Sequence, residues 1–216
     1  MKHIKIILQI VLALVIIYLG YKCYESIRIP ERFKEIQKQR NERIVERLKD
    51  IRTAQDAYRS VYGIYTPSLD TLIHFMKYDS VIIVRQIGSL TDDQVEQGIT
   101  EEEAIKKGWI IRENIKVNAL ENTFGKDYPI DNLKIVPFTQ GKYQFRMGAD
   151  IYVTDSGVQV PIFEAWISND EIFADLQEQY GEQIKEANGE QLRLKKYPGL
   201  KVGSLKEANN NVGNWE

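Results

Sequence analysis

The stretch IILQIVLALVIIYLGY, Ile6–Tyr21, decides the fold of this chain of 216 residues. Its residues, from position 6 to position 21, are all uncharged, and Gln9 is the only strongly polar one. As a helix rising 1.5 Å per residue it would span about 24 Å, slightly short of the ~30 Å hydrocarbon core of a bilayer, and flanking residues extend its reach because Lys5 and Lys22 can snorkel. The segment is apolar around its whole circumference, which favours a membrane span over a buried core helix. We therefore predict a membrane anchor over residues 1–23, with these side chains facing lipid: Ile6, Leu8, Val11, Leu12, Leu14, Val15, Ile17 and Leu19.

A cleaved signal peptide is the main alternative to a permanent anchor. Cleavage requires small residues after the apolar run, and the segment YLGYK at Tyr18–Lys22 does not supply them. Lys2 and Lys5 precede the anchor and favour a cytoplasmic N-terminus. These patterns predict a single-pass protein of the inner (cytoplasmic) membrane whose C-terminal domain is periplasmic, or otherwise extracytoplasmic.

The charged segment that follows, Glu25–Tyr62, predicts a helical stalk over residues 24–63, because Glu, Lys, Arg and Gln are good helix formers. Pro30 predicts a kink or the beginning of a second helix. Beyond it, apolar residues recur at spacings of three, four and seven, which indicates one apolar stripe on a charged rod. The stripe either packs on the chain's own sheet or meets partner helices in a bundle or coiled coil. Four of its residues form the predicted packing or partner face: Ile44, Leu48, Ile51 and Tyr58.

The stalk ends in the motif AQDAYRSVYG at Ala54–Gly63. Gly63 can adopt the left-handed conformation that caps a helix, and Pro67 prevents the helix from continuing. With Tyr58, Gly63, Tyr65 and the following SLDTL, this region resembles type IV pilins and the pseudopilins of type II secretion. The resemblance implies that the long helix lies on a small antiparallel sheet and that the glycine–tyrosine turn closes its end. The chain lacks the Gly-Phe-Thr-Leu-Ile-Glu-like processing site of those families, so the resemblance concerns architecture rather than filament formation.

The residues after Gly63 predict one extracytoplasmic domain, 64–216, of mixed helices and strands. The clearest signal is the alternation of apolar residues from Tyr143 to Val153, followed by turn residues and a second alternating run, which predicts a long hairpin with one buried face. Other segments predict short helices at 68–78 and 169–180, and strands at 81–87, 109–120, 133–138, 192–197 and 200–202. Trp215 is expected to pack against the domain. The predicted class is α+β: an N-terminal transmembrane helix continuing into a long amphipathic helix, packed on a small antiparallel β-sheet domain.

The sequence gives little sign of chemistry. A net charge of -2 leaves no electrostatic footprint for nucleic acid, and the single cysteine, Cys23, cannot form an intramolecular disulfide. There is no phosphate loop, nucleophile elbow or His-x-x-x-His pattern, and the two histidines, His3 and His74, lie far apart in the sequence. The acidic run 92–103 is interpreted as a solvated turn and helix start rather than as a cation site. We predict no catalytic residue, no cofactor and no metal site.

The expected function is therefore that of a non-catalytic, single-pass membrane subunit of a cell-envelope assembly, a pseudopilin-like structural and interaction protein. Its expected partners are membrane lipid and proteins of that assembly, further copies of the same chain included, and not nucleic acid. The alternative is a membrane-tethered module that binds peptide or glycan through the aromatic residues Phe124 and Tyr128. A tethered hydrolase would require a cleft with perturbed carboxylates, which the sequence does not identify.

Overall fold

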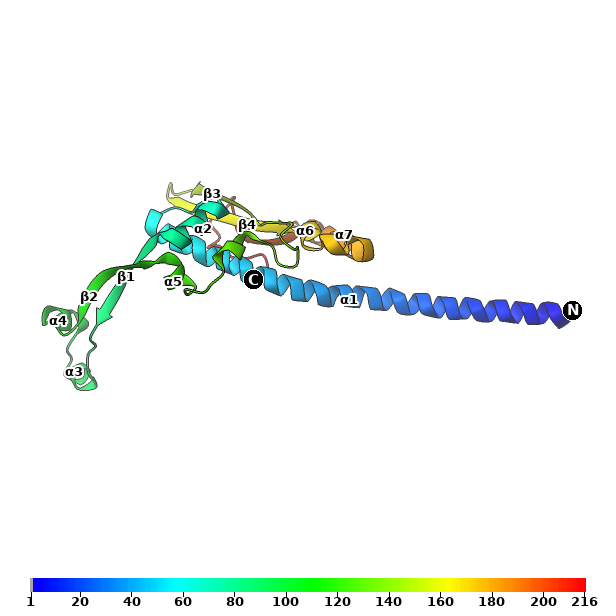
Figure 1. Cartoon of the computed structure of the whole chain (residues 1–216), viewed down its shortest axis with the longest axis horizontal. Helices are drawn as coiled ribbons and strands as arrows, with labels where there is room; N and C mark the ends of the chain where they lie inside the picture. The colour runs from blue at the N-terminus through cyan, green and yellow to red at the C-terminus, as the bar shows by residue number, and fades with distance from the viewer. Residues whose placement is uncertain (1) are drawn as a thin grey trace.

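The computed structural model describes residues 2–216, and the side chains of residues 5, 6 and 9–216. One long helix, α1 (Lys2–Tyr62), carries a folded domain along its C-terminal half, while its N-terminal half extends away from the domain (Figure 1). From Gln9 onward this helix is long and apolar enough to cross a membrane. The predicted α+β class is confirmed.

Helix α1 continues through Pro30 without a break, so the prediction of a second helix beginning there is wrong. The helix is held on the C-terminal side of the proline by packing against the domain. The ring of Phe33 lies 5.3 Å from that of Phe173 and 5.6 Å from that of Tyr180. The predicted boundaries at residues 23 and 63 stay predictions, and the helix passes residue 23 uninterrupted.

Shorter elements follow α1 and build two separate antiparallel sheets, β1-β2 and β3-β4-β5. In chain order they are α2 (Leu69–Tyr78), β1 (Ser80–Ile87), α3 (Asp92–Glu96), α4 (Glu101–Lys106), β2 (Ile111–Asn118), α5 (Ala119–Thr123), η1 (Ile130–Lys134), β3 (Arg146–Val153), β4 (Gln159–Ser168), α6 (Asn169–Ile172), η2 (Ala174–Leu176), α7 (Gln177–Arg193) and β5 (Gly199–Gly203).

The core lies between the second half of α1, helix α2 and the three-stranded sheet. The central strand β4 contributes Phe163, Ala165 and Ile167, all fully buried. Helix α2 adds Leu72 and Met76, which are also fully buried. Each large apolar side chain buried in this way contributes roughly 1.5–3 kcal/mol before the entropy cost of ordering is subtracted.

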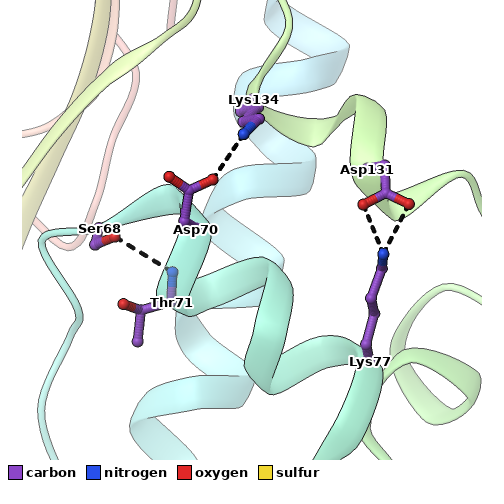
Figure 2. A network of polar contacts seen from close by, with 6 residues as sticks. All are labelled: Ser68, Asp70, Thr71, Lys77, Asp131 and Lys134. Carbon is purple, nitrogen blue, oxygen red and sulfur yellow. Dashed lines mark hydrogen bonds and ion pairs between the residues drawn. The ribbon is translucent and has the colours of Figure 1, made fainter.

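Polar contacts fasten α2 to the 3-10 helix η1 at the surface of the domain (Figure 2). The ammonium of Lys77 donates to both carboxylate oxygens of Asp131, at 2.6 and 2.7 Å, and Lys134 donates to Asp70 at 2.7 Å. The hydroxyl of Ser68 accepts from the backbone N–H of Thr71 at 3.3 Å, as expected of a helix N-cap. Because the carboxylates are exposed, these ion pairs position the two helices and contribute little to the free energy of unfolding.

The predicted hairpin is confirmed as β3 and β4, although its buried face is shorter than the alternation suggests. Phe145 is buried and Met147 is half-buried, whereas Ile151 and Val153 are 49% and 55% exposed. The two exposed residues lie next to the turn, at the margin of the sheet.

Two predicted strands are wrong. Residues 133–138 form the end of η1 and a single bridge between Ile135 and Gln144, and Leu133 is buried against the core from a 3-10 turn rather than from a strand. Residues 192–197 are also not a strand, because α7 continues to Arg193 before the chain turns at Lys195 with φ of 56°.

The C-terminal residues close the sheet. Gly213 forms a bridge with Val202 of β5, and Trp215 packs over Gly213 and against the core, as predicted. The guanidinium of Arg52 in α1 donates to the carbonyl of Asn211 at 3.1 Å and to Glu216 at 3.0 Å. The chain end therefore ties the sheet to the long helix.

Candidate interaction surfaces

The predicted lipid-facing side chains are all solvent-exposed where the structure describes them. Seven of them are between 45% and 69% exposed, and no part of the domain covers them: Ile6, Val11, Leu12, Leu14, Val15, Ile17 and Leu19. The side chain of Leu8 lies outside the described residues. An apolar helix surface of this extent requires an apolar environment, and a bilayer provides one.

The predicted packing face lies inside the chain's own core. Ile44, Leu48 and Ile51 are fully buried, and Tyr58 is half-buried with its ring 5.1 Å from that of Phe75. These side chains pack on the domain of the same chain, which is the first of the two interpretations of the stripe. They are not free to form a coiled coil with another helix.

The part of α1 around Arg40, although polar in sequence, is also joined to the domain. Arg40 donates to the carbonyl of Ile172 at 2.8 Å and forms a two-pronged ion pair with Asp175 at 2.6 and 2.7 Å. The hydrogen bonds from Arg40 lower the pKa of the Asp175 carboxyl. This pair joins α1 to the segment that leads into α7.

The motif at the end of α1 is a structural device built around a buried amide. The side chain of Gln55 is fully buried, donates to the carbonyl of Thr66 at 2.6 Å and accepts from the N–H of Thr66 at 3.1 Å. Gly63 (φ 76°) ends the helix by donating to the carbonyl of Arg59 at 2.8 Å, so the chain reverses and brings Thr66 back beside α1.

Tyr65 is the second residue whose buried contacts hold this turn in place. Its buried ring lies 4.8 Å from that of Phe163, and its hydroxyl donates to Asp56 at 3.1 Å. The same oxygen accepts from Arg59 at 2.7 Å and from Asn211 at 2.7 Å. Sequence reasoning singled out the glycine–tyrosine turn but missed the roles of Gln55 and Asn211. A polar residue on an otherwise apolar helix face was the available signal for Gln55.

The most prominent surface feature is an arm formed by residues 80–118. Within the described residues, strands β1 and β2 pair only with each other, and Figure 1 shows them projecting from the end of α1, with α3 and α4 at the tip. Ile82 and Val84 lie on one face of this ribbon, each 64% exposed, and Ile111 on the other face is 52% exposed. A two-stranded ribbon is marginally stable alone, and such exposed apolar positions are typical of docking surfaces.

A hollow of about 460 Å³ lies at the base of the arm, between the end of α1 and β1. Tyr62, Tyr78 and Ile82 supply its exposed apolar rim. The phenol of Tyr62 donates to Asp79 at 3.0 Å, and this hydrogen bond raises the pKa of Tyr62. The phenol of Tyr62 is therefore a weaker acid than an isolated tyrosine.

The tip of the arm concentrates negative charge. Residues 88–110 carry six carboxylates, Asp92, Asp93, Glu96, Glu101, Glu102 and Glu103, against Lys106 and Lys107. Three of these acids occupy the first turn of α4, where they complement the helix dipole as predicted. Ala104 and Ile110 are fully buried and give the tip a small core of its own.

The residues considered for chemistry or ligand binding are dispersed. His74 lies exposed on α2, with its ring 4.8 Å from that of Tyr78. The rings of Phe124 and Tyr128 stack at 4.4 Å and pack against the core, and the Tyr128 phenol donates to Asp50 at 2.5 Å. Among the residues that the structure describes, no three His, Cys, Asp or Glu side chains are grouped in a way that could hold a metal ion.

Comparisons with family models, with curated proteins and with solved structures gave no match for this chain.

Proposed function

We propose that this chain is a non-catalytic, single-pass membrane subunit of a cell-envelope assembly, with an architecture like that of pseudopilins. The observation that carries the proposal is the continuity of α1. Its N-terminal part exposes apolar side chains all round, and its C-terminal part is the spine of a folded domain. A helix of this kind holds the domain at a set height above the membrane surface.

The arm is the element that we propose for docking protein partners. It extends past the end of α1, exposes apolar side chains on both faces, and leaves the outer edges of β1 and β2 without a strand partner in the described chain. Open strand edges with exposed apolar residues are suited to β-strand addition by another protein. The acidic tip favours a partner with a basic surface, because opposite charges attract across an interface. Two copies of this chain would not pair through their tips, since tips at the same height above the membrane carry the same charge and repel one another.

The proposed location is the inner membrane, with the N-terminus in the cytoplasm and the domain outside it. Lys2 and Lys5 before the apolar segment support this orientation. Cleavage at the end of the segment would remove the anchor and would contradict the proposal. The mass of the mature chain distinguishes the two cases.

Photo-cross-linking in native membranes tests the docking role. A photoreactive residue at Val84, in the middle of the arm, is expected to give one discrete cross-linked protein, and the same residue at Leu192 on α7 serves as the control because it is equally exposed, at 60%. The Val84 product should disappear in an Ile82→Lys variant. Alkaline extraction checks that the chain carrying the photoreactive residue at Val84 is still in the membrane. If it is, and only uncross-linked chain is recovered, docking through the arm is contradicted.

The alternative of a tethered peptide- or glycan-binding module has a weaker basis. The aromatic residues that suggested it, Phe124 and Tyr128, stack on each other and face the core, and burial together with the hydrogen bond to Asp50 raises the pKa of Tyr128. Their faces do not form an open platform for a sugar or a peptide.

A further inference from the structure

A second hollow, of about 320 Å³, lies where α1 leaves the expected membrane region. Residues from Tyr21 to Arg32 of α1 form one wall, and Gln179 and Tyr180 at the start of α7 form the other. In Figure 1, α7 is the part of the domain that reaches furthest toward the N-terminal half of α1. The hollow therefore faces the membrane surface from beneath the domain.

The charges in this hollow are unevenly balanced. Among the side chains that the structure describes, Glu25 is the only carboxylate that lines it, and it accepts from Lys22 at 3.1 Å and from the Tyr21 phenol at 3.4 Å. Arg28 and Arg32 also line it, and neither has an ion-pair partner within the part of the chain that the structure describes. Two exposed guanidinium groups are thus available to an anion.

The height of these groups matches the level of lipid phosphates. A ~30 Å hydrocarbon core takes about 20 helical residues, so an anchor beginning at Lys5 leaves the core at about Tyr24. Arg28 and Arg32 then lie about 6 and 12 Å further along the axis. The headgroup layer is about 5–7 Å thick on each side, and a long arginine side chain can reach down into it.

The other groups that line the hollow also bear on the kind of headgroup that would fit it. The guanidinium carbon of Arg28 lies 5.3 Å from the centre of the Tyr24 ring, so a cation already occupies one face of this ring. The amide of Gln179 can donate to or accept from a hydroxyl. A phosphodiester with an uncharged, hydroxyl-bearing headgroup satisfies both arginines and introduces no further positive charge.

We propose that this hollow binds the headgroup of an anionic phospholipid, with Arg28 and Arg32 holding the phosphate. The inference rests on the proposed membrane anchoring and concerns a site separate from the arm. Bound in this way, the lipid would fill the space between the stalk and α7 and hold the domain at the membrane surface.

The single cysteine, Cys23, is exposed on the same stretch of α1 as the hollow and allows a direct test with the full chain. The protein carries a fluorophore on Cys23 and is reconstituted into phosphatidylcholine vesicles. The vesicles contain a small fraction of a quencher lipid that is spin-labelled near the top of its acyl chain. Quenching is compared between a phosphatidylglycerol quencher and a phosphatidylcholine quencher. We expect stronger quenching by phosphatidylglycerol, because each basic group near an anionic lipid is worth about a factor of five in association. The variant R28Q/R32Q should lose this preference at least fivefold, and K38Q/R43Q, which removes two charges higher on the same helix, should keep it.

The possible results separate the two proposals. Equal quenching by both lipids in the unmodified chain, or a preference that survives in R28Q/R32Q, overturns the headgroup site while leaving the anchor in place. The absence of quenching by either lipid shows that Cys23 is not at a bilayer surface and overturns the anchor as well. If soluble glycerol phosphate abolishes the preference at constant ionic strength, the ligand is the free anion and the lipid assignment is wrong.

Discussion

Replacing Gln55 by leucine should destabilise the domain more than any other single polar change in α1. The substitution keeps most of the side-chain volume but leaves the N–H and the carbonyl of Thr66 without partners in the interior, where Thr66 is 4% exposed. An unsatisfied buried polar group costs about 1–3 kcal/mol, so the two together cost about 2–6 kcal/mol. For a chain of this size, 1 kcal/mol lowers Tm by roughly 2–4 °C, which predicts a fall of roughly 4–24 °C.

The assay is thermal unfolding of the full chain in detergent, followed by near-ultraviolet circular dichroism of its tyrosine and tryptophan side chains. Gln39→Leu is the matched control, because Gln39 is exposed on the same helix. A Tm for Gln55→Leu within about 2 °C of the Gln39→Leu value, on the scale of roughly 2–4 °C per kcal/mol, would refute the assigned role of the amide.

A Gln55→Glu variant adds a pH signature to the same test. The carboxylate can accept from the Thr66 N–H but confronts the Thr66 carbonyl, and burial raises the pKa of such a group above its unfolded value of ~4.3. The protonated acid can donate to that carbonyl as the amide does. Stability relative to the wild type should therefore increase as the pH falls through the raised pKa, and the Tm difference should narrow between about pH 7 and pH 5.

Three further predictions concern packing, charge and backbone conformation. Leu48→Ala should cost about 2–5 kcal/mol in urea unfolding with an unchanged m-value, since a fully buried side chain leaves a cavity. Arg40→Met should speed amide exchange in α7 at neutral pH, because it removes the ion pair with Asp175. In the wild type, the stability that this ion pair contributes should be lost as the pH falls through the pKa of Asp175, which lies below its ordinary value of 3.8. Gly203→Ala should lower Tm far more than Gly63→Ala: both residues have positive φ, but an added Cβ at 203 would lie 2.1 Å from a backbone oxygen, whereas at 63 it meets open space. Equal Tm values for the two glycine variants would contradict this difference.

The parts of the fold that could be predicted from the sequence are those specified by short-range patterns. Helix α2 follows from its N-cap at Ser68 and its three-and-four spacing, and the hairpin follows from alternation on either side of Asp155-Ser156-Gly157. The self-packing of Ile44 and Leu48 was one of two interpretations, because the periodicity shows a buried face without showing what covers it.

The parts that could not be predicted depend on contacts between distant segments. The apolar run around Leu133 has the composition of a strand, yet it is buried from a 3-10 turn held under α2 by Lys77 and Lys134. The arm could be recognised only as two separate strands, since nothing local indicates that β1 and β2 leave the domain together. The headgroup hollow was likewise hidden, because α7 and the base of the stalk are about 150 residues apart in the sequence.

The proline inside α1 has a mechanical consequence. Pro30 has no N–H, so the carbonyl of Ser26 loses its helical donor, and bending costs least at this turn. This turn of α1 lies just above the expected bilayer surface. It comes just before Phe33, whose ring packs against Phe173 and Tyr180 of the domain. In the proposed membrane orientation, the N-terminal part of α1 can therefore tilt to match the local bilayer thickness without changing the orientation of the domain.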